Sequence, residues 1–154
     1  MTADAAPVAG CRTYALGEME YVAICATDFM RRHFPAGINV HRLQSAPMMR
    51  FDRRDQLQAN WAQEACGARI SPPTHWTPST QGMLDMTLAG LGWSMAPLPL
   101  AEPLIAAKRL VEMPSGKRIR VKLYWQRTRL AASILDRLTE AVRMVAGSEL
   151  IQPA

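Results

Sequence analysis

The feature that most constrains the fold is the stretch from residue 79 to residue 100, which reads STQGMLDMTLAGLGWSMAPLPL. Two hydroxyl residues precede apolar positions at helical spacing, and Gly90 ends that pattern. A short hydrophobic segment follows and is closed by two prolines, which is typical of a buried strand leading into another helix. Ser79 or Thr80 is expected to cap the first helix. Its apolar face is formed by Met83, Leu84, Thr87 and Leu88.

Elsewhere the chain alternates short extended segments with helical patterns. Extended segments are predicted at 11–17, 19–26, 48–51, 91–97, 109–114 and 118–127, the last being the longest. Helices are predicted at 27–34, 39–47, 52–67, 79–90, 98–107 and 130–147. Thr27 or Asp28 is expected to cap the first helix. Strands alternating with helices predict an α/β fold with a largely parallel sheet.

Length and composition exclude several classes of protein. With 154 residues, 49% of them hydrophobic, the chain suits one globular domain or two small lobes. It has no uninterrupted apolar run long enough for a membrane span and no secretory signal, so we expect a cytoplasmic protein without membrane contact. Cys11, Cys25 and Cys66 are too widely spaced for a zinc or redox motif and are expected to be reduced packing residues.

The net charge of +5 is spread along the chain, except for one basic cluster from residue 116 to residue 129. There Arg118, Arg120 and Lys122 alternate with apolar residues, which is typical of a half-buried strand with a solvated basic face. The alternative is a contact surface for a partner or a nucleic acid.

No catalytic or metal-binding pattern stands out. Ser79 is not in a nucleophile elbow, and no serine or cysteine lies in a nucleophile motif with a histidine to serve it. His33, His41 and His75 lack the neighbours that a metal site needs, and no phosphate-binding glycine loop follows a strand. We therefore expect a non-enzymatic protein that needs no metal or cofactor.

A ligand site has more support. Ser79 and Thr80 offer two hydroxyls, free backbone amides and the positive end of a helix dipole, which suits a carboxylate. The simpler alternative is an ordinary helix cap worth about 1 kcal/mol. Asp52 fits either a counter-charge for a cationic group or another cap, and Trp76 fits either a pocket wall or the core. Ser79, Thr80 and Asp52 together suit an amino acid better than a phosphate.

Four runs, at residues 21–47, 51–58, 77–113 and 121–142, carry a family resemblance. In this order they resemble the C-terminal half of LysR-type transcriptional regulators, and most of all the ArgP/LysG-like branch, which responds to lysine and arginine and controls amino-acid export. The most specific parts are GLGWSMAP and LYWQ. The resemblance covers residues 11–147.

The resemblance implies an effector-binding domain built like a type II periplasmic binding protein, in which two α/β lobes enclose the ligand. Residues 14–113 are then expected to form the second lobe, and residues 114–147 the crossover strand and last helix of the first lobe. Residues 1–13 are expected to be a linker or a frayed end, and residues 148–154 a tail.

The resemblance also implies an effector and its site. Ser79 and Thr80 match the family's pocket-lining hydroxyl positions, and Asp52 falls in an FD pair that is typical of the amino-acid-export branch. Lysine, arginine or a related amino acid is the implied effector. The expected function is therefore the sensing part of a LysR-type regulator of amino-acid export.

The sequence differs from the family pattern at its N-terminal end. A winged helix-turn-helix, a linker helix and most of the first lobe have no counterpart, so DNA contact is expected only through a domain that this chain lacks. The last helix then keeps an unpartnered apolar stripe, formed by Ile134, Leu135, Leu138, Val142 and Val145. We expect a fragment that self-associates or associates with a full-length regulator. The alternative function is an interaction module that docks on full-length regulators without binding a ligand.

Overall fold

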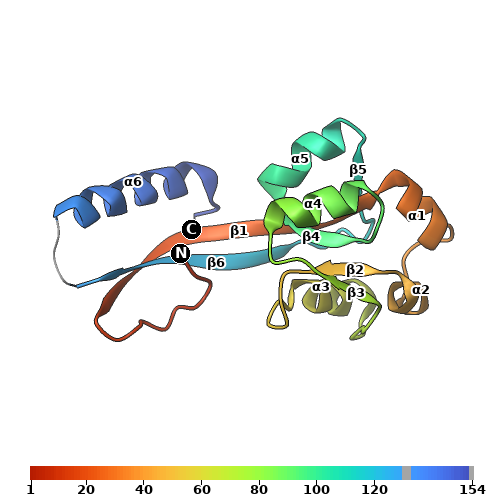
Figure 1. The fold of residues 1–154 in the computed structure, drawn as a ribbon, viewed down its shortest axis with the longest axis horizontal. Coiled ribbons are helices and arrows are strands. Elements are labelled where there is room, and N and C mark those ends of the chain that lie inside the picture. Colours follow the sequence, from red (N-terminus) through yellow and green to blue (C-terminus); the bar gives the residue numbers. More distant parts are fainter. Residues whose placement is uncertain (130–132, 153–154) are drawn as a thin grey trace. The chain divides into compact units, whose positions relative to one another are not determined.

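A computed structural model of the chain describes residues 1–129 and 133–152 (Figure 1). The chain divides into two compact units: unit 1 comprises residues 1–20 and 120–154, and unit 2 comprises residues 21–119. Strands β1 (Cys11–Ala26) and β6 (Ile119–Thr128) contribute residues to both. Among the described residues, no helix has the length and apolar character needed to cross a membrane. The predicted lobe boundaries, 14–113 and 114–147, stay a prediction.

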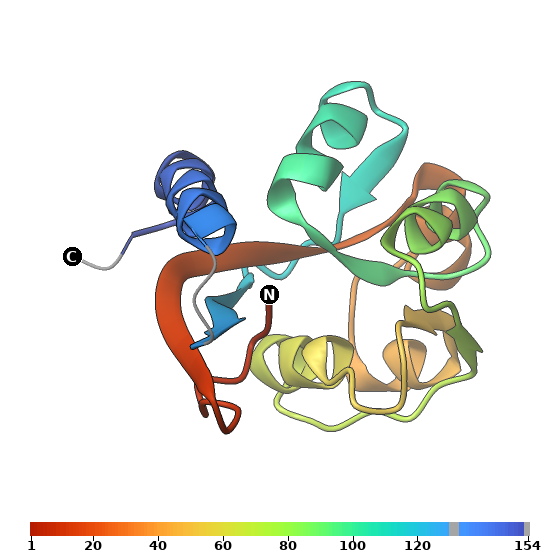
Figure 2. The ribbon, with the colours of Figure 1, turned by 60° about the vertical axis from the view of Figure 1, so that its left-hand side comes forward.

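Unit 2 holds most of the secondary structure and confirms the α/β class. Its elements are α1 (Thr27–His33), α2 (Val40–Ser45), β2 (Met48–Arg50), α3 (Leu57–Cys66), β3 (Thr74–Trp76), α4 (Thr80–Leu88), β4 (Ser94–Pro97), α5 (Leu98–Ala106) and β5 (Leu110–Glu112). Helices α2 and α3 lie side by side (Figure 2). Each helix expected in this part of the chain is present, although α3 begins five residues later than predicted.

The strand directions differ from the largely parallel sheet that the alternation predicts. In the larger sheet the order is β4–β1–β5, and both outer strands pair antiparallel with β1, which also pairs with β6. In the smaller sheet, β2 pairs with β3, and this is the parallel pair among the strand pairings that the structure describes. The prediction is wrong because β4 and β5, joined by the crossover helix α5, point the same way but have β1 inserted between them. Sequence alternation does not reveal such an insertion.

Strand β1 is longer than predicted and joins two segments that were expected to be separate. It runs for 16 residues, whereas β6, expected to be the longest strand, has 10. Gly17 does not end a segment: it has a φ of +132° inside the strand, and a Cβ there would lie 2.9 Å from the backbone oxygen of Ile151. The neighbouring Glu18 exchanges backbone hydrogen bonds with Ile151. Glycine is therefore needed here for a close approach of two backbones.

The helix ends confirm one predicted cap and correct another. Ser79 is the N-cap of α4, and its hydroxyl accepts a hydrogen bond from the Gly82 N–H. Neither Thr27 nor Asp28 caps α1, because strand β1 runs directly into that helix and Ala26 occupies the N-cap position without a side-chain bond. A residue type that often caps helices, placed near a helical pattern, therefore does not determine at which residue the helix begins.

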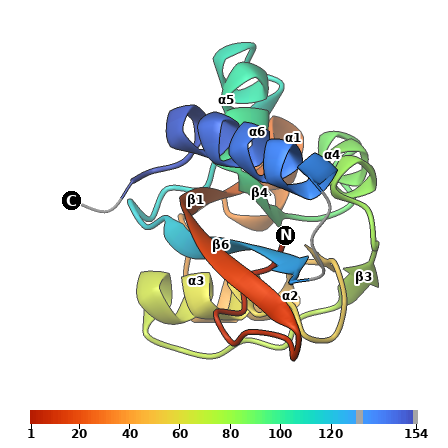
Figure 3. The same cartoon turned by 90° about the vertical axis from the view of Figure 1, so that its left-hand side faces the viewer.

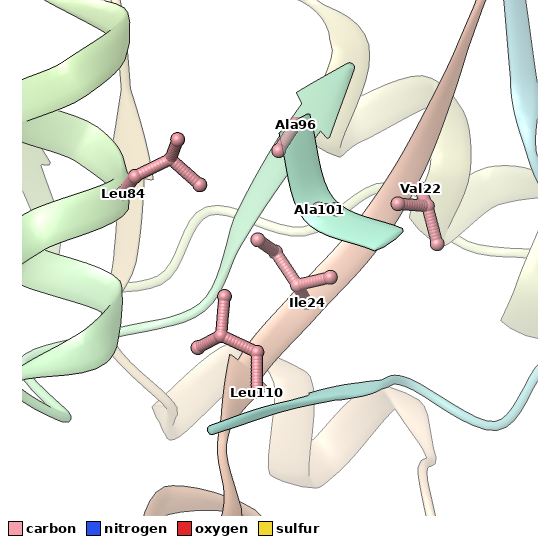
Figure 4. Packing of buried hydrophobic residues seen from close by; sticks show 6 residues of the cluster. All are labelled: Val22, Ile24, Leu84, Ala96, Ala101 and Leu110. Carbon is pink, nitrogen blue, oxygen red and sulfur yellow. The ribbon is translucent and has the colours of Figure 1, made fainter. Parts of the chain in front are cut away.

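The core of unit 2 connects its larger sheet to α4 and α5 (Figure 4). The central cluster consists of Val22, Ile24, Leu84, Ala96, Ala101 and Leu110. Burial of such side chains stabilises a fold by roughly 25 cal/mol per Å² of apolar surface. Because Leu84 comes from the middle of α4 and Ala96 from β4, the same packing holds α4 against strand β4.

In unit 1, helix α6 (Ser133–Glu149) covers one face of the strand pair formed by β1 and β6 (Figure 3). The indole N–H of Trp125 donates to the Thr139 hydroxyl at 3.1 Å. The guanidinium of Arg127 meets the Asp136 carboxylate at 2.5 Å. Polar contacts therefore supplement apolar packing in holding this helix on the strands.

The predicted apolar stripe of α6 is only partly covered. Leu135 and Val142 are half-buried. Leu138 and Val145 are 46% and 59% exposed. Ile134 lies outside the residues whose side chains the structure describes. Half of the described stripe therefore contributes little to the packing of unit 1.

The N-terminal segment is hydrogen-bonded to β6. Thr2 and Tyr124 exchange backbone hydrogen bonds of 2.9 and 2.8 Å, and the Gln126 amide donates to the carbonyl of Ala6. The basic face predicted for β6 is confirmed, since Arg120 and Lys122 are exposed while Ile119 is buried. Arg120 also pairs with Glu20 at 3.3 Å.

The three cysteines are free thiols, as predicted. Cys25 is buried in β1, and burial raises its pKa to about 12. Among the described residues, no group of histidine, cysteine, aspartate and glutamate side chains is placed to hold a metal ion.

Candidate functional site

The candidate site lies at the beginning of α4. Helix geometry leaves the N–H groups of Thr80 and Gln81 without an intrahelical acceptor, because the first bond of the helix runs from the Met83 N–H to the Ser79 carbonyl. A Cβ at position 82 would lie 2.9 Å from Thr77 Cγ2, so a larger residue there would have to displace the Thr77 side chain. This end of α4 thus combines free donors with the positive end of the helix dipole.

Beside this helix end is a cavity of about 290 Å³, which we call the α4 cavity. Its walls come from β1, the segment between β2 and α3, helix α4 and strand β4, all within unit 2. Most of the lining is apolar, and two aromatic side chains, Tyr21 and Phe51, contribute to it. Its polar side chains also include Asp55, Thr80 and Ser94. Among the lining side chains that the structure describes, Asp55 is the one that carries a charge at neutral pH.

The carboxylate of Asp55 is held firmly by hydrogen bonds. One of its oxygens accepts from the Phe51 N–H at 3.1 Å and from the Gln58 side chain at 3.2 Å, and the other accepts from the Leu57 N–H at 3.1 Å. Arg50 donates to the backbone carbonyl of Asp55. A carboxylate has about four acceptor positions, so these three bonds leave capacity for one further donor.

Tyr21 faces the same negative charge. Its phenol is half-buried, and burial raises its pKa, with a further increase from the charge of Asp55. Both effects disfavour the phenolate, so Tyr21 presents a neutral hydroxyl and an aromatic ring to the cavity at neutral pH.

Ser94 adds a hydrogen-bond acceptor. Its buried hydroxyl lies 2.9 Å from the hydroxyl of Thr87, which itself donates to the Met83 carbonyl at 2.7 Å. Since a hydroxyl has only one hydrogen to donate, Ser94 is the donor to Thr87. The Ser94 hydroxyl accepts no hydrogen bond from the other residues that the structure describes, so its lone pairs keep capacity for a further donor.

The residues predicted from the sequence lie in different places around this helix end. Thr80 lines the α4 cavity, and Ser79 caps the helix next to it. One oxygen of Asp52 accepts from the N–H groups of Arg54 and Asp55, and the side chain is not part of the cavity wall. Trp76 is 51% exposed on β3, outside the lining, with the Arg50 guanidinium 5.2 Å from its ring centre.

Sequence reasoning missed Asp55, Tyr21 and Ser94. Asp55 had a usable signal, because it stands just before α3, where a carboxylate satisfies free N–H groups of a helix. Ser94 was also visible as a polar residue inside a buried apolar strand. Nothing in the local sequence separates Tyr21 from the other residues of β1.

The sequence matches the LysR substrate binding domain family over residues 2–147. It is 36% identical to the transcriptional regulator LysG of Mycobacterium tuberculosis over 146 residues, which is 95% of this chain and 48% of that protein. It is 35% identical to the transcriptional regulator ArgP of Pseudomonas aeruginosa over 149 residues, or 97% and 49% of the two chains. The chain thus spans about half the length of these relatives, which are named as regulators and not as enzymes.

Solved structures give the same relationship. The C-terminal domains of a LysR family protein from Agrobacterium tumefaciens match with a TM-score of 0.93 at 43% identity, covering 99% of this chain and 73% of that one. ArgP from Mycobacterium tuberculosis matches with a TM-score of 0.90 at 35% identity, covering 99% and 52%. LysG from Corynebacterium glutamicum with bound effector Arg matches with a TM-score of 0.80 at 31% identity, covering 99% and 51%.

Proposed function

The chain belongs to the LysR substrate-binding domain family, and we propose that it senses a cationic amino acid, arginine or lysine, as part of a regulator of amino-acid export. The likeness to LysG and ArgP supports this assignment, and one solved LysG carries the effector Arg. The proposed role is binding without chemical conversion. Contact with DNA would come from a separate domain.

The α4 cavity offers complementary positions for the two ends of such an effector. The α-carboxylate is bound by the free N–H groups of Thr80 and Gln81 and by the Thr80 hydroxyl, with Ser79 holding the helix end in shape. The positively charged group is bound by the free acceptor position of Asp55 and by the Ser94 hydroxyl. Tyr21 contributes an aromatic ring, which attracts cations when they are partly desolvated.

One observation carries this proposal: a helix N-terminus and a single carboxylate border the same cavity, and the described lining contains no positive side chain. A phosphate or a dicarboxylate would meet Asp55 without a compensating cation. A neutral amino acid would leave the Asp55 carboxylate partly desolvated without a counter-charge, which is costly. The lining therefore favours a zwitterion that carries an additional positive charge.

A set of matched ligands tests the proposal by calorimetry with the full chain. Arginine and lysine are expected to bind. Citrulline has the shape of arginine without its charge, and agmatine lacks the carboxylate, so each is expected to bind about tenfold more weakly or worse. Equal binding of citrulline and arginine would contradict the role of Asp55. No binding of either arginine or lysine would contradict the proposed function.

A second candidate function rests on unit 1. A groove of about 460 Å³ with almost entirely apolar walls lies between α6 and strands β1 and β6. On α6, Val145 lines this groove and is 59% exposed. Apolar patches of this kind are typical of protein–protein contacts. We propose as this candidate that the chain docks on a full-length LysR-type regulator through α6, without needing a ligand.

Co-purification separates the two candidates. A tagged full-length ArgP relative is expected to retain this chain if α6 docks, whereas effector sensing alone predicts no such complex. Val145→Glu places a charge on the apolar face and should abolish retention, while Arg137→Glu changes an exposed charge on another face of the same helix and serves as the control. If the two variants behave alike, the docking face is not the apolar one.

A further inference from the structure

A second hollow in unit 2 borders the other end of α4. It has a volume of about 350 Å³ and is lined by the beginning of α1, the end of α4 and the turn after α5. Figure 1 shows α4 and α5 both ending on the side of unit 2 where α1 lies. The charged lining residues are Asp28, Arg32, Lys108 and Arg109. We call this site the basic hollow.

The charges of the basic hollow are not balanced by the protein. The Asp28 carboxylate is paired with Arg31, on the same helix. Arg32, Lys108 and Arg109 are exposed, and none of them forms an ion pair with any other residue that the structure describes. The Arg32 guanidinium reaches over the end of α4, since a Cβ on Gly90 would lie 3.6 Å from one of its nitrogens. Three positive side chains thus surround a space with one neutralised carboxylate.

The backbone gives an independent reason to look at Lys108. Helices α4 and α5 end in the same motif: the N–H of Leu91 bonds to the Met86 carbonyl, and the N–H of Arg109 bonds to the Leu104 carbonyl. This motif needs a left-handed residue, for which glycine is strongly preferred. Helix α4 has Gly90 there, with a φ of +72°, but α5 has Lys108, with a φ of +57°.

Lys108 is the one residue other than glycine with a positive φ in the described part of the chain. A left-handed conformation costs any residue that has a Cβ, and such strain in a native structure points to a function for the side chain. At this position the lysine adds a third positive charge to the basic hollow. The C-terminal ends of α4 and α5 carry partial negative charge and therefore attract cations. That attraction does not require a lysine in a left-handed conformation.

We propose that the basic hollow binds a phosphate group, as inorganic phosphate or as part of a small phosphorylated metabolite. Each arginine guanidinium can donate two parallel hydrogen bonds, and the lysine ammonium adds a compact positive charge. Together they match the charge and the several acceptor oxygens of a phosphate dianion. A single carboxylate would leave most of the positive charge unbalanced. The site is separate from the α4 cavity, so this inference does not rest on the proposed amino-acid effector.

Thermal melting of the full chain in phosphate, against sodium chloride of equal ionic strength, tests the inference. Phosphate also stabilises proteins by exclusion from their surface, so the measured quantity is the difference between wild type and variants. Lys108→Gly is the decisive variant. It removes a charge and relieves the left-handed strain, so it should raise the melting temperature without phosphate and reduce the shift that phosphate produces.

Calorimetric titrations complete the test. Phosphate binding is expected to weaken about fivefold or more in Lys108→Gly and in Arg32→Gln. Lys122→Gln, which removes an exposed charge on β6 in unit 1, is the matched control and should bind as wild type does. Titration with ribose 5-phosphate beside inorganic phosphate distinguishes the metabolite from the free ion, because the one that binds more tightly identifies the source.

Two results would overturn the inference. The first is a phosphate response that is absent, or that is equal in wild type, Lys108→Gly and Arg32→Gln, because the cations would then serve only the helix ends. The second is a DNA duplex that binds far more tightly than phosphate and loses affinity in these variants but not in Lys122→Gln. That result would assign the cluster to a nucleic acid.

Discussion

The two ends of α4 offer opposite environments. At its beginning, the α4 cavity is mostly apolar and contains one charged side chain, the hydrogen-bonded carboxylate of Asp55. At its end, the basic hollow is exposed and lined by three cations without protein partners among the described residues. In both places the charges come from neighbouring elements, and their sign is opposite to that of the adjacent end of the helix dipole. A nine-residue helix can therefore serve two ligands of opposite charge, each chosen by the segments packed around it.

The largest expected effect is at the carboxylate end. Asp55→Asn removes the charge but keeps the shape and one acceptor oxygen, so arginine binding should fall about tenfold to a hundredfold, the usual range for a hydrogen bond to a charged group. Calorimetry below the melting temperature of each variant gives the affinity. Asp52→Asn is the control, because Asp52 makes comparable turn contacts but lies outside the cavity wall. An equal loss in both variants would place the cationic group elsewhere.

The next effect concerns the opposite end of the helix and separates strain from charge. Gly90→Ala forces a Cβ into the left-handed position after α4, which should lower the free energy of unfolding by about 1 kcal/mol. Chemical denaturation measures it. Position 90 lines the basic hollow, but alanine removes no charge, so phosphate binding should weaken less than in Lys108→Gly. The two variants should change stability in opposite directions. A stabilised Gly90→Ala variant would show that the left-handed position carries no penalty in this motif.

A smaller effect is expected from the helix cap. Ser79→Ala removes the bond to the Gly82 N–H and should cost about 1 kcal/mol of stability or somewhat less, because Ser79 is exposed and water can replace it. Arginine binding should weaken by only a few fold, since Ser79 holds the helix end and Thr80 lines the cavity. Ser79→Asp is the matched variant, because aspartate also caps helices but repels a carboxylate. It should keep stability and still weaken arginine binding.

These contrasts show which parts of the molecule were accessible from the sequence. The cap at Ser79, the end of α4 at Gly90 and the buried strand that follows depend on residues within one turn of each other, so local signals predict them. The insertion of β1 between β4 and β5 depends on segments that lie 70 to 88 residues apart in sequence, and no local pattern records it.

The same distinction explains the candidate site. Asp52 and Asp55 both follow β2, and both accept backbone hydrogen bonds that stabilise the turn into α3. Which of the two faces a cavity depends on the path of that turn relative to α4 and β4, and this is a tertiary property. Tyr21 joins the site only because its strand pairs with β4, where its register partner is Pro97. Composition and spacing can therefore suggest a kind of ligand group, but they do not reveal which residues line the cavity.

The smallest expected effect concerns the pH dependence of the carboxylate end. Because burial and Asp55 raise the pKa of Tyr21, the folded protein keeps the phenolic proton at a pH where the unfolded chain releases it. The contribution of Tyr21 to stability is thus fully present below its ordinary pKa of about 10 and is lost as the pH rises through the higher value in the folded state.

Tyr21→Phe removes this titration. Wild type and variant should respond alike to pH between 7 and about 9, and above pH 10 the wild type should lose stability more steeply. Denaturation at a series of pH values measures the difference, and the other titrating groups, including Cys25, are common to both chains. Tyr14→Phe is the control, since the pKa of Tyr14 is lowered, chiefly by its hydrogen bond with Arg127, and its removal should not flatten the alkaline decline. Equal slopes for wild type and Tyr21→Phe would mean that Asp55 and Tyr21 do not share one desolvated cavity.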